Sequence, residues 1–108
     1  MHIIIDRDAV CAADDMSHHR EEFTVPDDIT IAGLFEFLEF KYIPVIAGNN
    51  VVWGLYYQDV EVGTYFTKIQ SFINGNVSLS SIISNSERDN EFYLRYYSHP
   101  DRYRKHFI

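Results

Sequence analysis

Residues 31–42 carry the spacing of an amphipathic helix, and this pattern limits the folds open to the chain more than any other feature. Apolar side chains recur there every three or four positions, at Ile31, Leu34, Phe35, Leu38 and Tyr42. Asp27, Asp28 and Thr30 precede the pattern and are suited to cap a helix N-terminus. Pro44 cannot continue the hydrogen-bond ladder of a helix. We therefore expect one helix of about three turns that buries one face.

Runs of strand length, rich in β-branched and aromatic residues, lie on both sides of this helix. They cover residues 2–6, 22–26, 51–57, 60–66 and 91–97. The pair Gln58-Asp59 separates the third run from the fourth, which predicts a hairpin. The segment 67–90 has no decisive pattern, and Pro100 is placed to open a short C-terminal helix.

These elements predict an α+β fold with a mostly antiparallel sheet and one main helix packed on one face. The expected order is β-β-α-β-β, then the weak segment, then a last strand. In element order, residues 2–66 resemble the β-grasp, or ubiquitin-like, arrangement. At 108 residues, with 46% hydrophobic and 16% aromatic residues, the chain has apolar material for one core, so we expect a single domain over residues 1–108.

Cysteine and charge content favour a cytoplasmic protein. Cys11 is the single cysteine, so an internal disulfide is excluded. The first residues predict no signal peptide, and no apolar run is long enough to predict a membrane span. The net charge of -7 disfavours nucleic acid and anionic membranes as partners. The glycines are isolated, so no nucleotide-binding motif is present and we expect no cofactor.

The negative charge is concentrated in the first 40 residues, which carry ten acidic residues against Arg7 and Arg20. The acidic residues that we expect to form a partner-binding surface are Asp14, Asp15, Glu21, Glu22, Asp27 and Asp28. Acidity of this kind steers association with a basic surface. The leading hypothesis is therefore a non-enzymatic protein-interaction domain for a basic protein partner, in the manner of an inhibitor or antidote.

Phe37 and Phe40 fall on the side of the helix away from its main apolar face. Two interpretations stay open. The rings form an exposed aromatic patch for a homodimer or another protein partner, or they are buried because a second segment covers the helix.

The loop from Cys11 to His19 supports an alternative function, a small enzyme or a metal-binding protein. Asp14 with His18, and Asp15 with His19, have the i,i+4 spacing that would share a helix face, so these four are candidate metal ligands. Cys11 could act as a nucleophile if a histidine of the loop deprotonated it. The competing interpretation is that Cys11 anchors the loop on the core while the acids and histidines are solvated.

Overall fold

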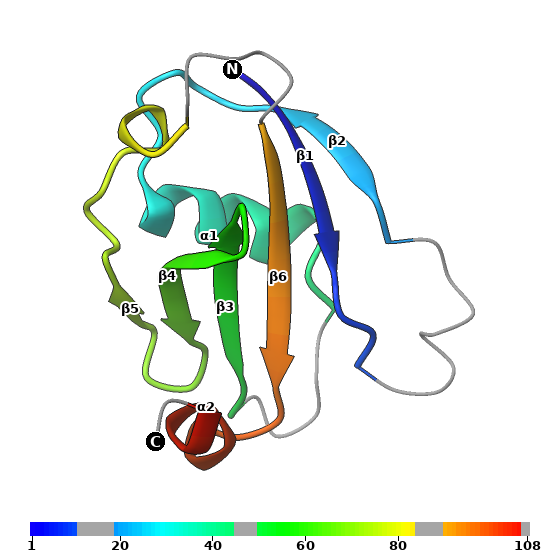
Figure 1. The fold of residues 1–108 in the computed structure, drawn as a ribbon, viewed down its shortest axis with the longest axis vertical. Helices are drawn as coiled ribbons and strands as arrows, with labels where there is room; N and C mark the ends of the chain where they lie inside the picture. Colours follow the sequence, from blue (N-terminus) through cyan, green and yellow to red (C-terminus); the bar gives the residue numbers. More distant parts are fainter. Residues whose placement is uncertain (11–18, 45–49, 84–89, 107–108) are drawn as a thin grey trace.

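The computed structural model describes residues 1–10, 19–44, 50–83 and 90–106, and of residues 105 and 106 the backbone only. These residues form a six-stranded sheet with two α-helices and a short 3-10 helix (Figure 1). The elements in chain order are β1 (His2–Arg7), β2 (Glu21–Thr24), α1 (Ile31–Lys41), β3 (Val52–Tyr57), β4 (Val60–Phe66), β5 (Ser71–Ile73), the 3-10 helix (Leu79–Ser81), β6 (Glu91–Tyr97) and α2 (Pro100–His106). The described part of the chain holds no helix of the length and apolarity that crossing a membrane requires.

The strands lie in the order β2-β1-β6-β3-β4-β5. All neighbours are antiparallel except β1 and β6, which pair in parallel from Ile4 opposite Glu91 to Arg7 opposite Leu94. The predicted α+β class and mostly antiparallel sheet are therefore confirmed. The sequence did not predict β5, because this strand has three residues at the sheet edge and no periodic pattern to detect.

The helix α1 packs on one face of the sheet because its apolar stripe matches the inward side chains of the strands. Thr30 caps α1, and its Oγ1 accepts a hydrogen bond of 3.1 Å from the backbone N–H of Gly33. Four helix residues, Ile31, Leu34, Phe35 and Leu38, are fully buried. They pack against strand residues that include Ile3, Ile5, Trp53, Leu55 and Leu94.

Figure 1 looks onto the opposite face of the sheet, with α1 behind the strands. Side chains alternate between the two faces along a strand. The residues next in sequence to the core residues of each strand therefore point to this second face, which we call the open face. The helix α2 lies at one end of it, where the ring of Tyr103 contacts the rings of Phe66 and Tyr97 edge-on. Among the described residues, one face of the sheet is covered by α1 and the other only at its α2 end.

The predicted hairpin is present, and its turn residues adopt an unusual backbone conformation. Gln58 and Asp59 both have positive φ, 50° and 65°. Two consecutive residues of this kind form the turn that suits the twist of a β-hairpin, although Asn-Gly fits it best. The turn places the Asp59 side chain at the rim of the open face.

Candidate functional site

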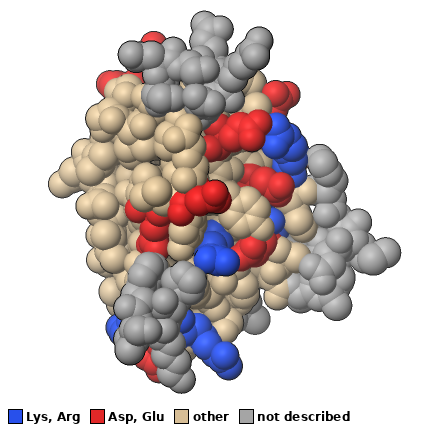
Figure 2. Space-filling view, viewed as in Figure 1, with Lys and Arg blue, Asp and Glu red and all other residues tan. Residues whose placement is uncertain are grey.

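The open face of the sheet contains a hollow of about 770 Å³. Its lining is made of charged and aromatic side chains with few aliphatic ones: Ile4, Asp6, Asp8, Arg20, Tyr56, Gln58, Asp59, Glu91, Phe92, Tyr93 and Arg95. Figure 2 shows this face, with acidic and basic side chains gathered over its middle. We call these lining residues the open-face hollow.

Strand pairing brings these residues together from distant parts of the chain. Tyr93 in β6 lies directly opposite Asp6 in β1 and, on its other side, opposite Tyr56 in β3. Glu91 and Arg95 are two positions from Tyr93 on the same strand and so share its face. Tyr93 is therefore at the centre of the hollow.

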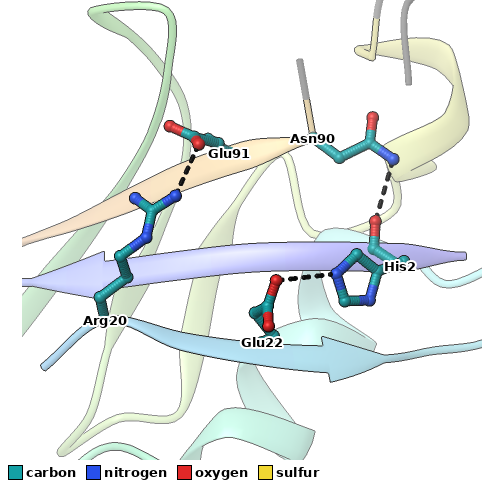
Figure 3. Close-up of polar contacts among 5 residues, drawn as sticks. All are labelled: His2, Arg20, Glu22, Asn90 and Glu91. Atoms are coloured by element: carbon teal, nitrogen blue, oxygen red, sulfur yellow. Dashed lines mark hydrogen bonds and ion pairs between the residues drawn. The ribbon is translucent and has the colours of Figure 1, made fainter. Parts of the chain in front are cut away.

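Four carboxylates and two guanidinium groups line the hollow, so its charge is negative overall. Arg20 reaches from the start of β2 across β1 and donates a hydrogen bond of 2.7 Å to Oε1 of Glu91 (Figure 3). The hydrogen bond and the charge of Glu91 raise the pKa of the Arg20 guanidinium. Because these two charges compensate each other, the remaining charges are those of Asp6, Asp8 and Asp59 against the one guanidinium group of Arg95.

Asp8 and Tyr93 are held in a fixed arrangement. The Tyr93 hydroxyl donates to Oδ1 of Asp8 over 2.5 Å, and the backbone N–H of Tyr96 donates to Oδ2 over 2.9 Å. Partial burial, and then the bond to the Asp8 carboxylate, raise the pKa of Tyr93 well above its ordinary value. The phenol thus stays protonated and keeps its ring in place, although 39% of the side chain is exposed.

Arg95 lies over the ring of Tyr56, with 5.7 Å between its Cζ and the ring centroid. A hydrogen bond with Tyr56 is the main cause that raises the pKa of Arg95. The guanidinium is therefore engaged by an aromatic ring of the hollow itself.

A second cluster of polar groups lies where α2 meets the sheet. Oε1 of Glu61 accepts a hydrogen bond of 2.8 Å from the Tyr103 hydroxyl and a very short one from the Thr64 hydroxyl. Oε2 of Glu61 accepts from the Tyr56 hydroxyl over 3.2 Å. A small depression of about 230 Å³ adjoins the cluster. The volume of this depression suits at most a small group. The hydrogen bonds of the Glu61 cluster hold α2 on the sheet.

Of the acidic residues that the sequence assigned to partner binding, the described ones lie in β2 and in the connection from β2 to α1. Glu22 shares the open face with Ile4, which is opposite it in β1, and contacts Nε2 of His2 at 3.3 Å (Figure 3). Glu21 is exposed on the edge strand β2. Asp27 and Asp28 are exposed in the connection to α1.

Asp27 also pairs with the N-terminal ammonium group, at 2.6 Å. The hydrogen bond from this ammonium group, with its positive charge, lowers the pKa of Asp27 below its ordinary value.

The loop from Cys11 to His19 falls mostly outside the described residues, which include His19 alone. Cys11, Asp14, Asp15 and His18 are therefore not placed, and their predicted roles stay predictions. His19 is half-buried, and its backbone carbonyl accepts a very short hydrogen bond from the Tyr42 hydroxyl. Within the described ranges, no three His, Cys, Asp or Glu side chains are grouped so that they could hold a metal ion.

Phe37 and Phe40 differ in their surroundings. The Phe37 ring is half-buried and packs against the core, whereas Phe40 is 83% exposed. The two rings therefore do not form one exposed stripe. Their role in binding a partner or a second copy stays a prediction.

The sequence analysis missed most of the open-face hollow. The alternation of Glu91, Tyr93 and Arg95 was a signal that these three share a face. Asp6, Asp8 and Asp59 carried no such signal, because only the pairing of β1 with β6 and the hairpin turn bring them to the same place.

Comparison with known proteins adds no assignment: no family model, no curated protein and no solved structure matches the chain.

Proposed function

We propose that this chain is a non-enzymatic protein-interaction domain that binds a basic segment of a partner protein in the open-face hollow. The observation that carries the proposal is the charge of the hollow. Carboxylates outnumber guanidinium groups there, and one of the two guanidinium groups is already paired with Glu91. A positively charged partner segment would complement this surface.

The form of the hollow favours a polypeptide as the ligand. Many of the lining side chains are exposed, among them Arg20, Gln58, Asp59 and Glu91. A small molecule is usually enclosed by its pocket, whereas a peptide segment can lie across a shallow, rigid face. Three neighbouring strands support the lining residues Asp6, Tyr56 and Tyr93, so the surface is formed before the partner arrives.

Acidic residues outside the hollow also favour a basic partner. Glu22 adds a carboxylate on the open face, and Glu21, Asp27 and Asp28 would contribute long-range attraction. Asp14 and Asp15 would act in the same way, by their charge alone. The exposed ring of Phe40 is a second contact for the partner or for a second copy of the chain.

An inhibitor or antidote that covers a basic site is the concrete form of the function that we favour. The single Cys11 supports action in the reducing cytoplasm. We also propose the β-grasp type for the fold, supported by the β-β-α-β-β order and by the helix on one face.

An affinity experiment with matched variants tests the proposed function. Wild-type protein, an Asp6→Lys/Asp59→Lys variant and a Glu36→Lys/Glu39→Lys variant would each be used to capture proteins from a lysate of the source cells. The second variant makes the same charge change on exposed positions of α1, behind the sheet. Captured proteins would be identified, purified and titrated at low and high salt.

We expect a basic partner that binds wild type and the α1 variant but not the hollow variant. Its affinity should fall as salt rises, because screening weakens attraction between exposed charges. A partner that binds the hollow variant as tightly as wild type, or that is indifferent to salt, would contradict the proposal.

A further inference from the structure

The centre of the open-face hollow combines an aromatic ring with carboxylates on two sides. The residue Tyr93 is 39% exposed, and its hydroxyl is fixed by Asp8. Asp6 lies beside it in β1, and Asp59 lines the same hollow from the hairpin turn. In the part of the chain that the structure describes, no ring or cation stacks on Tyr93, and Asp59 has no hydrogen-bond or ion-pair partner.

This arrangement selects among cationic side chains. A guanidinium group is planar, stacks on an aromatic face and donates two parallel hydrogen bonds to a carboxylate. An ammonium group is a compact, strongly hydrated charge that gains less from a flat ring. Within the described residues, a guanidinium group lies over an aromatic ring twice, with Arg95 over Tyr56 at 5.7 Å and Arg7 over Tyr42 at 5.6 Å, and an ammonium group does so once, with Lys41 over Phe40 at 5.2 Å.

We infer that the partner segment presents an arginine whose guanidinium group stacks on Tyr93 and pairs with Asp6 and Asp59. This inference rests on the proposed function and names the chemistry by which the hollow recognises its partner. An anionic side chain is disfavoured, because beyond the Arg20–Glu91 pair the hollow has three carboxylates against the single guanidinium group of Arg95.

Three blocked tripeptides that differ in one side chain test the inference without knowledge of the partner. Acetyl-Gly-Arg-Gly-amide, its lysine counterpart and its citrulline counterpart would be titrated into ¹⁵N-labelled protein. Citrulline has nearly the shape of arginine but no charge. We expect the arginine peptide to shift the amide signals around Asp6, Asp59 and Tyr93 in a saturable way, with a Kd of about 1–10 mM. The lysine peptide should bind roughly three-fold more weakly and the citrulline peptide at least about ten-fold more weakly.

Conservative variants locate the binding. Asp6→Asn keeps an oxygen for the backbone N–H of Arg7, which donates to Oδ1 of Asp6 over 2.8 Å. Asp59→Asn keeps a residue that tolerates positive φ. Each variant should bind the arginine peptide about two- to five-fold more weakly than wild type. Tyr93→Phe should bind nearly as wild type, whereas Tyr93→Val should lose about five-fold or more, and Glu36→Gln should change nothing.

Equal binding of the citrulline peptide, shifts centred outside the hollow, or no saturable shift at about 50 mM peptide would overturn the arginine assignment. The result of the peptide titration is independent of the result of the capture experiment. Loss of a basic partner by the Asp6→Lys/Asp59→Lys variant would still support the proposed function, and the partner would then use other basic groups.

Discussion

The ring of Phe37 in α1 packs edge-on against the ring of Phe23 in β2, with 5.3 Å between the ring centroids and 85° between the ring planes. Tyr42, just after the helix, meets the same Phe23 ring from a second direction at 5.9 Å. These contacts tie the edge strand to the helix. Phe40, three residues beyond Phe37, takes no part in them and is 83% exposed.

Replacement by serine should therefore destabilise the protein at Phe37 and leave its stability nearly unchanged at Phe40. We expect Phe37→Ser to lower the free energy of unfolding by about 2 kcal/mol, because it removes a half-buried ring and its edge-on contact with Phe23. Phe40→Ser should change it by less than about 0.5 kcal/mol. Urea denaturation measures both values. Equal losses for the two variants would contradict the difference in packing.

Glu61 and Tyr103 should be coupled, because their 2.8 Å hydrogen bond helps to hold α2 on the sheet. We expect Glu61→Gln to cost about 1–2 kcal/mol and Tyr103→Phe about 1 kcal/mol. The double variant should cost less than the sum of both. Hydrogen exchange should show faster opening of α2 in either single variant. As a control, Asp101→Asn removes an exposed ion pair within α2 and should cost under about 0.5 kcal/mol.

Gly63 in β4 should not tolerate a methyl group. A Cβ there would lie 2.7 Å from Cγ2 and 3.0 Å from Cδ1 of Ile31, whose side chain is fully buried and cannot swing away. We expect Gly63→Ala to cost about 1–3 kcal/mol.

Gly33→Ala is the matched control, since its Cβ would meet the partly exposed Ile29 side chain at 3.3 Å and would favour the helix. Its cost should stay under about 0.5 kcal/mol. Thermal unfolding compares the two variants, and an equal fall in Tm would refute the close approach of β4 to α1.

Alkaline pH should unfold the protein through phenols whose pKa is raised by partial burial. Burial, with a further effect of the hydrogen bond to Glu61, raises the pKa of Tyr103 to about 12. Burial raises the pKa of Tyr42, Tyr65, Tyr93 and Tyr97 further above the ordinary value. In the unfolded chain, the tyrosine hydroxyls lose their protons at about pH 10.

Because their pKa values are raised in the folded state, the protonated phenols stabilise the fold. This contribution is fully present below about pH 10. That contribution is lost as pH rises from there through the folded-state pKa of about 12 for Tyr103. Urea midpoints measured from pH 8 upward should stay level and then fall, and tyrosinate absorbance should rise together with unfolding. Titration of all tyrosines near pH 10 in the folded state would show that these rings are not buried as described.

Local patterns predicted the elements of this fold because their causes are local. Capping by Thr30, the three-to-four spacing of α1 and the alternation of β6 depend on neighbours in the chain, and each is present. The predicted site depended on charge composition, which does not tell where in the fold each charge lies. It therefore named acids in different elements, such as Glu22 in β2 and Asp27 in the connection to α1.

The sequence determined an α+β fold with one main amphipathic helix, a hairpin over residues 51–66 and an acidic first part, since hydrophobic periodicity and charge can be read from the chain alone. Only the tertiary structure decided that β1 and β6, some 90 residues apart, lie side by side in parallel. That pairing brings Asp6 next to Tyr93, and the positive φ of Asp59 brings a further carboxylate to the same hollow. No local interaction specifies that these side chains lie together. Their proximity results from the burial of Ile3, Ile5 and Leu94 in one core beneath α1.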